Sequence, residues 1–175
     1  KMNFGSAGNG SAVHLAAEQL RAAAGLDLIH IPYKGTGQSL ADIVGGQLNM
    51  LFSTQAVAKP LHNSGRVRAL AITAPKRTHV MPELSTFAES GFPAVDAATI
   101  NGLLAPVGAP RDYVQRVNAA VQRALKSKEL QAKLSDLGFE IAGGSPEDFA
   151  QWIRGEIPKW ARVVKTANVK VEGGP

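Results

Sequence analysis

The chain has 175 residues, of which 45% are hydrophobic and 19% are charged, a composition that excludes a disordered chain and predicts a globular protein with a core. It has no cysteine, which excludes disulfides, zinc–thiolate sites and a catalytic thiol. The net charge is +5, but the basic residues are scattered with few aromatic residues between them, so a mixed-charge surface is favoured, an anionic ligand comes next, and nucleic acid is not expected.

No segment resembles a membrane span or a secretory leader. The two longest stretches without a charged residue, Met2–Ala17 and Ile43–Ala58, contain glycines and polar residues, and they fall short of the roughly 18 apolar residues that a spanning helix needs. The sequence opens on Lys1 without a leader, so we expect the chain to be processed or cut at its start.

The first half alternates predicted strands with predicted helices. Hydrophobic periodicity predicts strands at 2–4, 26–31, 48–52 and 67–73, and helices at 11–24, 38–44 and 54–62. Gly25 stands just past the first helix, where glycine commonly ends one. This order, with its short turns, predicts a parallel sheet with right-handed crossovers, in which ligands bind at the carboxyl ends of the strands.

The second half contains fewer predicted strands. Its expected elements are a short helix at 85–90, a strand at 99–105, helices from Pro110 that break near Ser127, a strand at 139–142 and a final helix. Ser145 is expected to cap that helix, and Pro158 to kink it. Two strands are too few to cover these helices. We therefore divide the chain into 1–97, a complete α/β domain, and 98–175, the trailing part of another domain.

The strongest local signal is the glycine–serine loop Gly5–Ser11, which joins a strand to a helix N-terminus. Amide groups there are unpaired and the helix dipole is positive, which suits an anion, and glycine lets the backbone approach a ligand closely. Ser6, Asn9 and Ser11 are candidate side-chain donors. The alternative is a tight turn in which Ser11 only caps the helix.

Two further polar loops follow predicted strands. Tyr33–Gly37, with Thr36, precedes the second helix, and Ser53 and Thr54 follow the strand that ends at Phe52. Because parallel strands end at the same edge of a sheet, we expect the three loops to meet there. Together they predict a crevice for an anion or a polar ligand.

Other kinds of site are disfavoured. The glycines lack the G-x-G-x-x-G order and the next strand ends without an acid, so a dinucleotide site is not expected. No P-loop or G-x-S-x-G motif occurs, and no histidine pair has metal-ligand spacing. His14, beside the glycine loop, either lends a proton or positive charge to a bound carboxylate or packs and hydrogen-bonds at the helix start, which is favoured. His30 is expected to be buried and neutral.

Six motifs occur in order along nearly the whole chain. They are Gly-Ser-Ala-Gly-Asn-Gly-Ser-x-x-His-Leu-Ala-x-Glu at 5–18, Ile-Pro-Tyr-Lys-Gly-Thr-Gly-x-Ser-Leu-x-Asp at 31–42 with Gly-Gly-Gln at 45–47, and further runs at 65–73, 82–91, 102–110 and 145–160. The last run reads Ser-Pro-Glu-Asp-Phe-Ala-x-Trp-Ile-Arg-x-Glu-Ile-x-Lys-Trp. In these motifs the chain resembles the tripartite tricarboxylate transporter substrate-binding proteins, also called Bug or TctC-like receptors.

The resemblance implies an α/β fold with periplasmic-binding-protein type 2 architecture. Two α/β domains of such a receptor close around a small organic anion, usually a carboxylate, and pass it to membrane permease subunits. The resemblance also implies no catalytic residue, no cofactor and no metal, and a periplasmic location in a Gram-negative bacterium. A ligand-sensing receptor for signalling on the same fold, and an enzyme that acts on a small acid, are the alternatives.

By position, the resemblance assigns ligand binding to the three loops: Ser6, Ala7, Gly8, Asn9, Gly10, Ser11, His14, Tyr33, Lys34, Gly35, Thr36, Gly37, Ser53 and Thr54. Family members often carry an acid where this chain has Ser53, which disfavours an amino-acid ligand and favours a mono- or dicarboxylate. Members are also longer, with most of the first domain upstream. Residues 98–175 would then be the returning part of that domain plus the terminal helix, with apolar surface free for a dimer or domain swap.

Overall fold

The computed structural model describes residues 1–169, which form two compact units. Of the described residues, one unit contains 1–99 together with 160–169, and the other contains 100–159. The sequence-based assignment of 1–97 and 98–175 to two domains of a longer receptor stays a prediction.

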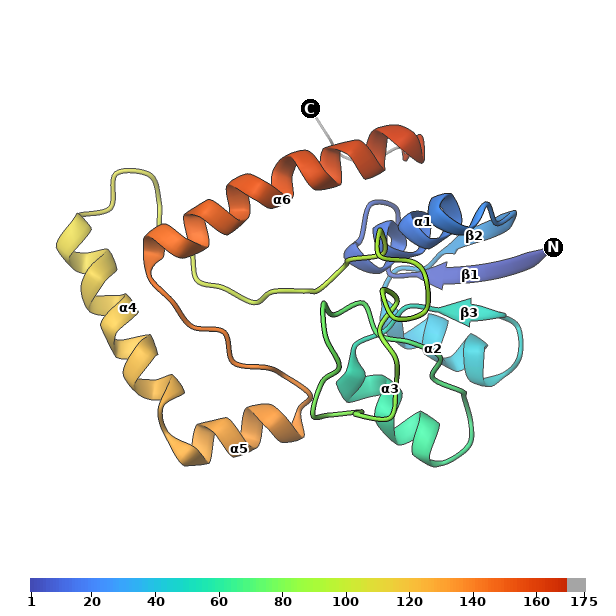
Figure 1. Ribbon diagram of the computed structural model, residues 1–175, viewed down its shortest axis with the longest axis horizontal. Coiled ribbons are helices and arrows are strands. Elements are labelled where there is room, and N and C mark those ends of the chain that lie inside the picture. The colour runs from blue at the N-terminus through green and yellow to red at the C-terminus, as the bar shows by residue number, and fades with distance from the viewer. Residues whose placement is uncertain (170–175) are drawn as a thin grey trace. The chain divides into compact units, whose positions relative to one another are not determined.

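A three-stranded parallel sheet is the centre of the first unit (Figure 1). The elements of this unit are, in chain order, β1 (Met2–Ser6), α1 (Ala12–Ala24), β2 (Leu28–Pro32), α2 (Thr36–Val44), β3 (Met50–Leu51) and α3 (Gln55–Asn63). The strand order is β2-β1-β3, and Phe4 pairs with both His30 and Met50, so β1 is the central strand. The predicted α/β class and the parallel sheet are confirmed.

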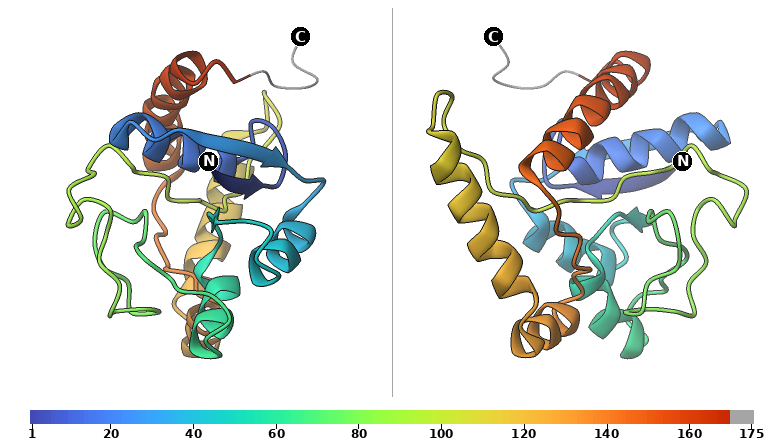
Figure 2. Two further views of the ribbon diagram at one scale, coloured as in Figure 1. Left: turned by 90° about the vertical axis from the view of Figure 1, so that its right-hand side faces the viewer. Right: turned by 60° about the vertical axis from the view of Figure 1, so that its left-hand side comes forward.

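The helices α1 and α2 lie on opposite faces of this sheet (Figures 1 and 2). Successive side chains of a strand point to opposite faces. Phe4 of β1 lies near His14 of α1, with ring centroids 6.1 Å apart, whereas a Cβ placed on Gly5 would lie 3.2 Å from Cβ of Ser39 in α2. The connection from β1 to β2 runs to one side of β1, and the connection from β2 to β3 crosses back to the other side. Because both crossovers are right-handed, α1 and α2 lie on opposite faces of the sheet.

Buried side chains stabilise two parts of the first unit. The first consists of β1 and α1, where Phe4, Leu15, Ala16, Ala17 and Leu20 are buried. The second lies in the segment after α3 and contains Ile72, Val80, Met81 and Leu84, with Ala69 and Ala74 packed against it. Full burial of a side chain of the size of Leu or Met stabilises a fold by about 1.5–3 kcal/mol. Packing therefore holds the segment after α3 although it contains little regular secondary structure.

The ends of α1 follow from its sequence. The Ser11 hydroxyl oxygen accepts the N–H of His14 at 3.4 Å, and a side-chain cap of this kind contributes about 1 kcal/mol. Gly25 follows the last residue with a φ of 61°, a left-handed conformation that favours glycine, and its N–H donates to the carbonyl of Arg21. The predicted start and end of this helix are confirmed.

Four predicted elements are wrong. The predicted strand at 67–73 is reduced to an isolated parallel bridge between Ile72 and Thr86. The predicted helix at 85–90 is a series of turns, and the predicted strands at 99–105 and 139–142 are irregular segments. A strand needs a neighbour for its backbone groups, and β3, with two residues, offers a very short edge. An apolar run alone does not supply that neighbour.

The second unit contains helices. α4 (Arg111–Leu125) and α5 (Lys128–Asp136) are separated by Lys126 and Ser127, near which the sequence predicts a break. The Ser127 hydroxyl oxygen accepts the N–H of Leu130 at 3.5 Å and so caps α5.

The last helix, α6 (Pro146–Thr166), begins in the second unit and ends in the first. Its start is a capping box: the Asp148 N–H donates to the Ser145 hydroxyl oxygen at 3.1 Å, and the Ser145 N–H donates to Asp148 Oδ2 at 2.9 Å. The hydroxyl and then the amide of Ser145 lower the pKa of Asp148. Pro158 lies inside the helix, and its kink stays a prediction. Within residues 1–169, no helix is both long and apolar enough to cross a membrane.

Candidate functional site

Three loops follow the carboxyl ends of the parallel strands. β1 ends at Ser6, β2 at Pro32 and β3 at Leu51, and one of the polar loops singled out in the sequence follows each of them. β2 and β3 flank β1 on opposite sides, so the switch point of the sheet lies between β1 and β3. Ligands of open α/β sheets bind at such a point. The structure therefore brings the three loops to the edge of the sheet where binding is expected.

The loop after β1 is held by hydrogen bonds of its own. The Ser11 hydroxyl donates to the Gly8 carbonyl at 2.8 Å, and the Ser11 N–H donates to the same oxygen at 3.2 Å. The Gly8 N–H donates to the Ser6 hydroxyl oxygen at 3.1 Å. Gly8 and Gly10 have φ values of 121° and 75°, which side-chain-bearing residues rarely adopt. The loop is thus a closed turn whose shape depends on these two glycines.

The start of α1 supplies amide donors next to this turn. The first N–H groups of a helix have no acceptor within it, and the Ser11 cap satisfies that of His14. The N–H groups of Ala12 and Val13, the first two helical residues, lie at the positive end of the helix dipole. Asn9, in the turn, is exposed. This arrangement suits an anion.

Two of the three predicted side-chain donors are engaged inside the protein. Ser6 is fully buried, and its hydroxyl oxygen lies 2.7 Å from Nε2 of His30. The Ser11 hydroxyl contacts the Gly8 carbonyl and the His14 N–H, so it performs the capping role that the sequence left as the alternative. Of the three, Asn9 is the side chain that is exposed.

His14 is buried beneath the loop, with 4% of its surface exposed. Its Nδ1 accepts the N–H of Gly10 at 3.0 Å, and its Nε2 faces Oε1 of Glu18 at 3.6 Å. Burial lowers the pKa of His14, an effect that the neighbouring Glu18 carboxylate opposes. The ring is therefore neutral near pH 7. This geometry fits the packing and hydrogen-bonding role, and it does not fit a cation that faces a ligand.

The second loop is tied to the first loop and to α2. The Tyr33 N–H donates to the Ser6 carbonyl at 3.1 Å, and the Tyr33 hydroxyl donates to Oδ2 of Asp42 at 2.6 Å. That hydrogen bond raises the pKa of Tyr33. Thr36 and Gly37 lie in the first turn of α2, while Gly35 precedes it. Lys34 is exposed and is the one lysine or arginine among the ligand-binding residues assigned from the sequence.

Ser53 and Thr54 complete this edge of the sheet. Both residues are exposed. Thr54 precedes α3, and its carbonyl accepts the N–H groups of Val57 and Ala58 at 3.1 and 3.0 Å. Its side chain makes no cap hydrogen bond, so α3 does not use the Thr54 hydroxyl. Ser53 and Thr54 thus present hydroxyl groups beside the strand end.

Sequence reasoning missed two contributors to this edge. His30 contacts the buried Ser6 hydroxyl, and Asp42 holds the Tyr33 hydroxyl. A parallel register that pairs Phe4 with His30 puts the His30 side chain on the same face as Phe4 and Ser6, but that register is not visible in the sequence. Asp42 stands nine residues after Tyr33, and although both belong to the motif at 31–42, nothing in that motif predicts the hydrogen bond between them.

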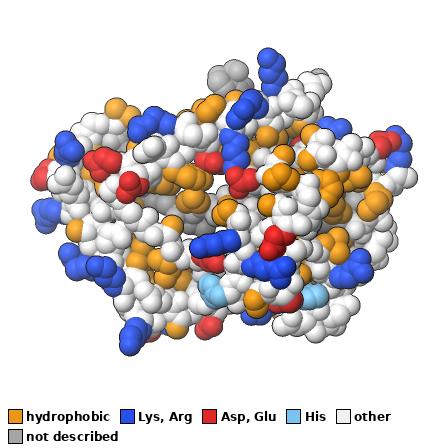
Figure 3. Space-filling view, in the orientation of Figure 1, with side chains coloured by type: hydrophobic (Ala, Val, Ile, Leu, Met, Phe, Trp, Pro, Cys, Tyr) orange, Lys and Arg blue, Asp and Glu red, His pale blue; other side chains and the backbone are white. Residues whose placement is uncertain are grey.

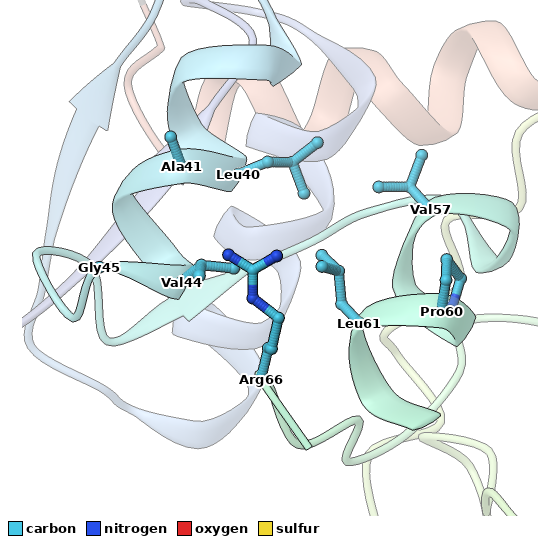
Figure 4. A pocket seen from close by; sticks show the side chains of 8 residues that line it. All are labelled: Leu40, Ala41, Val44, Gly45, Val57, Pro60, Leu61 and Arg66. Carbon is cyan, nitrogen blue, oxygen red and sulfur yellow. The ribbon is translucent and has the colours of Figure 1, made fainter. Parts of the chain in front are cut away.

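An apolar groove lies between α2 and α3, away from the three loops (Figure 4). It has a volume of about 540 Å³ and is lined by Leu40, Ala41, Val44, Gly45, Val57, Pro60, Leu61 and Arg66. None of the ligand-binding residues assigned from the sequence belongs to this lining. The groove and the loop edge are therefore separate features.

On the face that Figure 3 shows, charged side chains do not gather at a second place. On the face in Figure 3, the Lys and Arg side chains are spread among other residues and do not gather into one patch. Among residues 1–169, no group of three or more histidines or acids is placed to hold a metal ion. The loop edge offers backbone amides, hydroxyl groups and the exposed Lys34 as its binding groups.

Relatives match nearly the whole chain. The UPF0065 protein in the tcbD-tcbE intergenic region of Pseudomonas sp. (strain P51) is 35% identical over 165 residues, which cover 94% of this chain and 49% of that protein. The UPF0065 protein in the clcB-clcD intergenic region of Pseudomonas knackmussii is 35% identical over 159 residues, which cover 90% of this chain and 94% of that protein. The chain thus spans about half the length of the first relative and most of the second.

Two solved structures are similar in fold. R. palustris Rpa4515 with adipate has a TM-score of 0.85 and 33% identity, with 97% of this chain and 56% of that chain covered. MatC (Rpa3494) from Rhodopseudomonas palustris with bound malate has a TM-score of 0.77 and 33% identity, with 93% and 56% covered. The model of the family described as tripartite tricarboxylate transporter family receptor, TctC, matches residues 1–169. The chain therefore belongs to the TctC family of tripartite tricarboxylate transporter receptors, as its six motifs indicate.

Proposed function

We propose that this chain is the ligand-binding part of a periplasmic receptor that captures a small organic carboxylate. The observation that carries the proposal is the sheet edge where three polar loops meet beside the unpaired amides of Ala12 and Val13. Two structural neighbours at 33% identity are described with adipate and with malate, which are both dicarboxylates. We therefore infer a dicarboxylate as the ligand class.

One carboxylate of the ligand accepts hydrogen bonds from the turn after β1 and from the first amides of α1. Charge-assisted hydrogen bonds contribute about 1.5–3 kcal/mol each, and a helix N-terminus adds about 0.3–1 kcal/mol for a nearby anion. Association itself costs several kcal/mol, so several donors must converge for useful affinity. The turn is already closed by its own hydrogen bonds, which reduces the entropy lost on binding.

The other two loops meet the remainder of the ligand. Lys34 supplies a positive charge, and Ser53 and Thr54 supply hydroxyl groups. Ser53 carries no charge to pair with an ammonium group, so a ligand without an amino group is favoured. We propose binding without catalysis, because the histidine at the loop, His14, is buried and its Nδ1 already accepts the Gly10 N–H.

The family assignment extends the proposal to partners. Membrane permease subunits of a tripartite tricarboxylate transporter are the proposed recipients of the ligand, and the periplasm is the proposed location. Residues 1–97 form one ligand-binding domain in this proposal, and 98–175 belong to the other. Leu103, Leu104 and Val107 in the second segment are exposed by 71%, 79% and 107%, and they are the surface by which two chains would dimerise or swap segments.

Calorimetric titration of the chain with adipate, with malate and with dimethyl adipate tests the ligand class. We expect saturable binding of a diacid and none of the ester, because the ester has no charge for the amides and Lys34. Lys34→Ala is expected to weaken binding about fivefold, the equivalent of about 1 kcal/mol, while Lys59→Ala on α3 serves as the matched control. A folded chain that binds no diacid, or that binds the ester equally well, would contradict the proposal.

A further inference from the structure

Three nearly parallel rings lie directly behind the turn after β1. The rings of His14 and His30 have centroids 3.8 Å apart and an interplanar angle of 10°. Phe4 stacks on His30 at 4.9 Å and 21°, and it lies 6.1 Å from His14. The three residues come from α1, β2 and β1, so this ring cluster joins all three elements that border the turn.

Each imidazole in the ring cluster is connected to one amide of the turn. His14 is connected directly, because its Nδ1 accepts the N–H of Gly10 at 3.0 Å. His30 is connected through Ser6, whose hydroxyl oxygen lies 2.7 Å from Nε2 of His30 and accepts the N–H of Gly8 at 3.1 Å. Gly8 and Gly10 are the two residues of the turn that have left-handed φ values. The cluster thus contacts the backbone at the two residues of the turn whose φ values are left-handed.

The hydrogen bond from the Gly10 N–H to Nδ1 of His14 requires an uncharged His14 ring, whereas Nε2 of His30 can either donate to or accept from the Ser6 hydroxyl. Burial, and to a lesser extent the neighbouring His14, lower the pKa of His30 to about 4. The pKa of His14 is lowered mainly by burial as well. The charged groups on α1 that face His14 are Glu18, with Oε1 3.6 Å from Nε2, and Arg21, which pairs with Glu18 at 2.6 Å. At neutral pH both imidazoles are therefore available as hydrogen-bonding groups without charge.

We propose that His30 is a positioning residue for the carboxylate site. It fixes the turn after β1 through the Ser6 hydroxyl and through the His14 ring, and it does not touch the ligand. This inference rests on the proposed function. A residue that only filled space between β2 and α1 would not need a ring nitrogen aimed at a fully buried hydroxyl. The Ser6 hydroxyl also donates to the Gly8 carbonyl at 3.1 Å, so the His30 contact adds a third partner that fixes one orientation of Ser6 and, with it, of Gly8.

His30→Phe is the central test, because it keeps a flat ring and removes the nitrogen. The chain is titrated with adipate as the probe, and His62→Phe is the matched control, since His62 lies on α3 away from the turn. We expect His30→Phe to bind adipate about tenfold more weakly, because the amides of the turn that donate to the carboxylate are displaced. His62→Phe is expected to bind adipate like the wild type. Equal adipate affinity in His30→Phe and the wild type would overturn the inference while the proposed function stands.

A second readout decides the inference without any ligand. In ¹H–¹⁵N spectra, His30→Phe is expected to move the amide resonances of Gly8 and Gly10 and to leave that of Gly37 on α2 in place. Ser6→Ala would also remove the direct contacts of the Ser6 hydroxyl with Gly8, so the second variant is His30→Leu, which lacks the ring nitrogen, is expected to move the same two resonances and keeps the test open should His30→Phe fail to fold. Unchanged Gly8 and Gly10 resonances in a folded variant would overturn the inference, whether or not the wild type binds adipate. Failure of the wild type to bind any diacid would instead count against the proposed function.

Discussion

Substitution of Gly5 by alanine tests the packing of α2 against the central strand. Gly5 lies in β1 and faces α2, and an added Cβ would be 2.5 Å from Cδ1 of Leu48 and 3.2 Å from both Cβ of Ser39 and Cε2 of Tyr33. Contacts under 3.0 Å force a shift of one of the partners. Leu48 is 3% exposed and Ser39 is fully buried, so neither side chain has free space into which to move.

The expected cost follows from that confinement. Inserting one methyl group into a tightly packed core costs about 1–3 kcal/mol. For a chain of 175 residues, each kcal/mol lowers the unfolding temperature by about 2–4 °C, so Gly5→Ala should melt roughly 2–12 °C below the wild type. Gly37 in α2 is the matched control, because nothing lies within 4 Å of a Cβ added there. Alanine at that helical position should leave stability unchanged or raise it by up to about 1 kcal/mol.

Urea unfolding followed by far-ultraviolet circular dichroism, with thermal melts alongside, measures both variants against the wild type. The comparison of midpoints is valid if the slopes of the urea curves agree. A Gly5→Ala variant as stable as Gly37→Ala would refute the close approach of α2 to β1 at this residue. Because Tyr33 leads from β2 into the second polar loop, we also expect Gly5→Ala to disturb that loop.

Three other predictions concern charge and capping. Burial lowers the pKa of His30 to about 4 in the folded chain, against about 6.5 in the unfolded chain, so the unfolded chain binds the proton first and the stability falls as the pH drops from about 6.5 to 4. The loss of stability is at most about 3 kcal/mol, and it is smaller because the ring is partly exposed. Urea midpoints should therefore fall less over this pH range in His30→Phe than in the wild type. Arg21→Ala removes the contacts of 2.6 and 2.7 Å to the buried Glu18 carboxylate and should lower the stability by about 1–3 kcal/mol. Glu18→Gln added to Arg21→Ala should restore most of that stability. If the melting temperature of the double variant does not recover, the pairing of Arg21 with Glu18 is not what stabilises the fold. Ser145→Ala removes the hydroxyl that accepts the Asp148 N–H at the start of α6, and it should lower the stability by about 0.5–2 kcal/mol. The helical signal should then be lost at a lower temperature, whereas an unchanged melting curve would show that the cap contributes nothing.

The sequence predicted best those elements whose ends carry their own chemistry. Ser11 and Gly25 mark the start and end of α1, Ser127 marks the break between α4 and α5, and Ser145 marks the start of α6. Each of these signals acts within a few residues of chain, through a hydroxyl at an amide or a glycine at a left-handed φ. Local chemistry of this kind is readable without a fold.

Strands were less predictable because their stability depends on a partner. The run at 67–73 has the composition of a strand, yet only Ile72 forms a bridge, to Thr86. β3 keeps just Met50 and Leu51 of the predicted 48–52. Neither outcome can be inferred from composition, since both depend on which chain segment lies alongside.

The place of the candidate site was predictable, but the roles of its side chains were not. Strand ends and glycines indicated the edge of the sheet, and the structure confirms that the parallel strands end there. Whether Ser6 faces a ligand or the interior depends on the register with β2, which puts His30 beside it. The residues assigned to ligand contact from the family resemblance stay a prediction until a bound acid is observed.

The strand order also has a consequence for how the chain assembles during synthesis. Ser6 and His30 are separated by 24 residues, while Asn3 and Asn49, which bridge β1 to the start of β3, are separated by 46. A doubling of loop length adds only about 0.6 kcal/mol of closure entropy, so neither pairing is much harder to form than the other. On the ribosome, however, β1, α1 and β2 emerge before β3 does. The turn after β1 can therefore take its shape on the nascent chain, and Ser53 and Thr54 reach an edge that is already built.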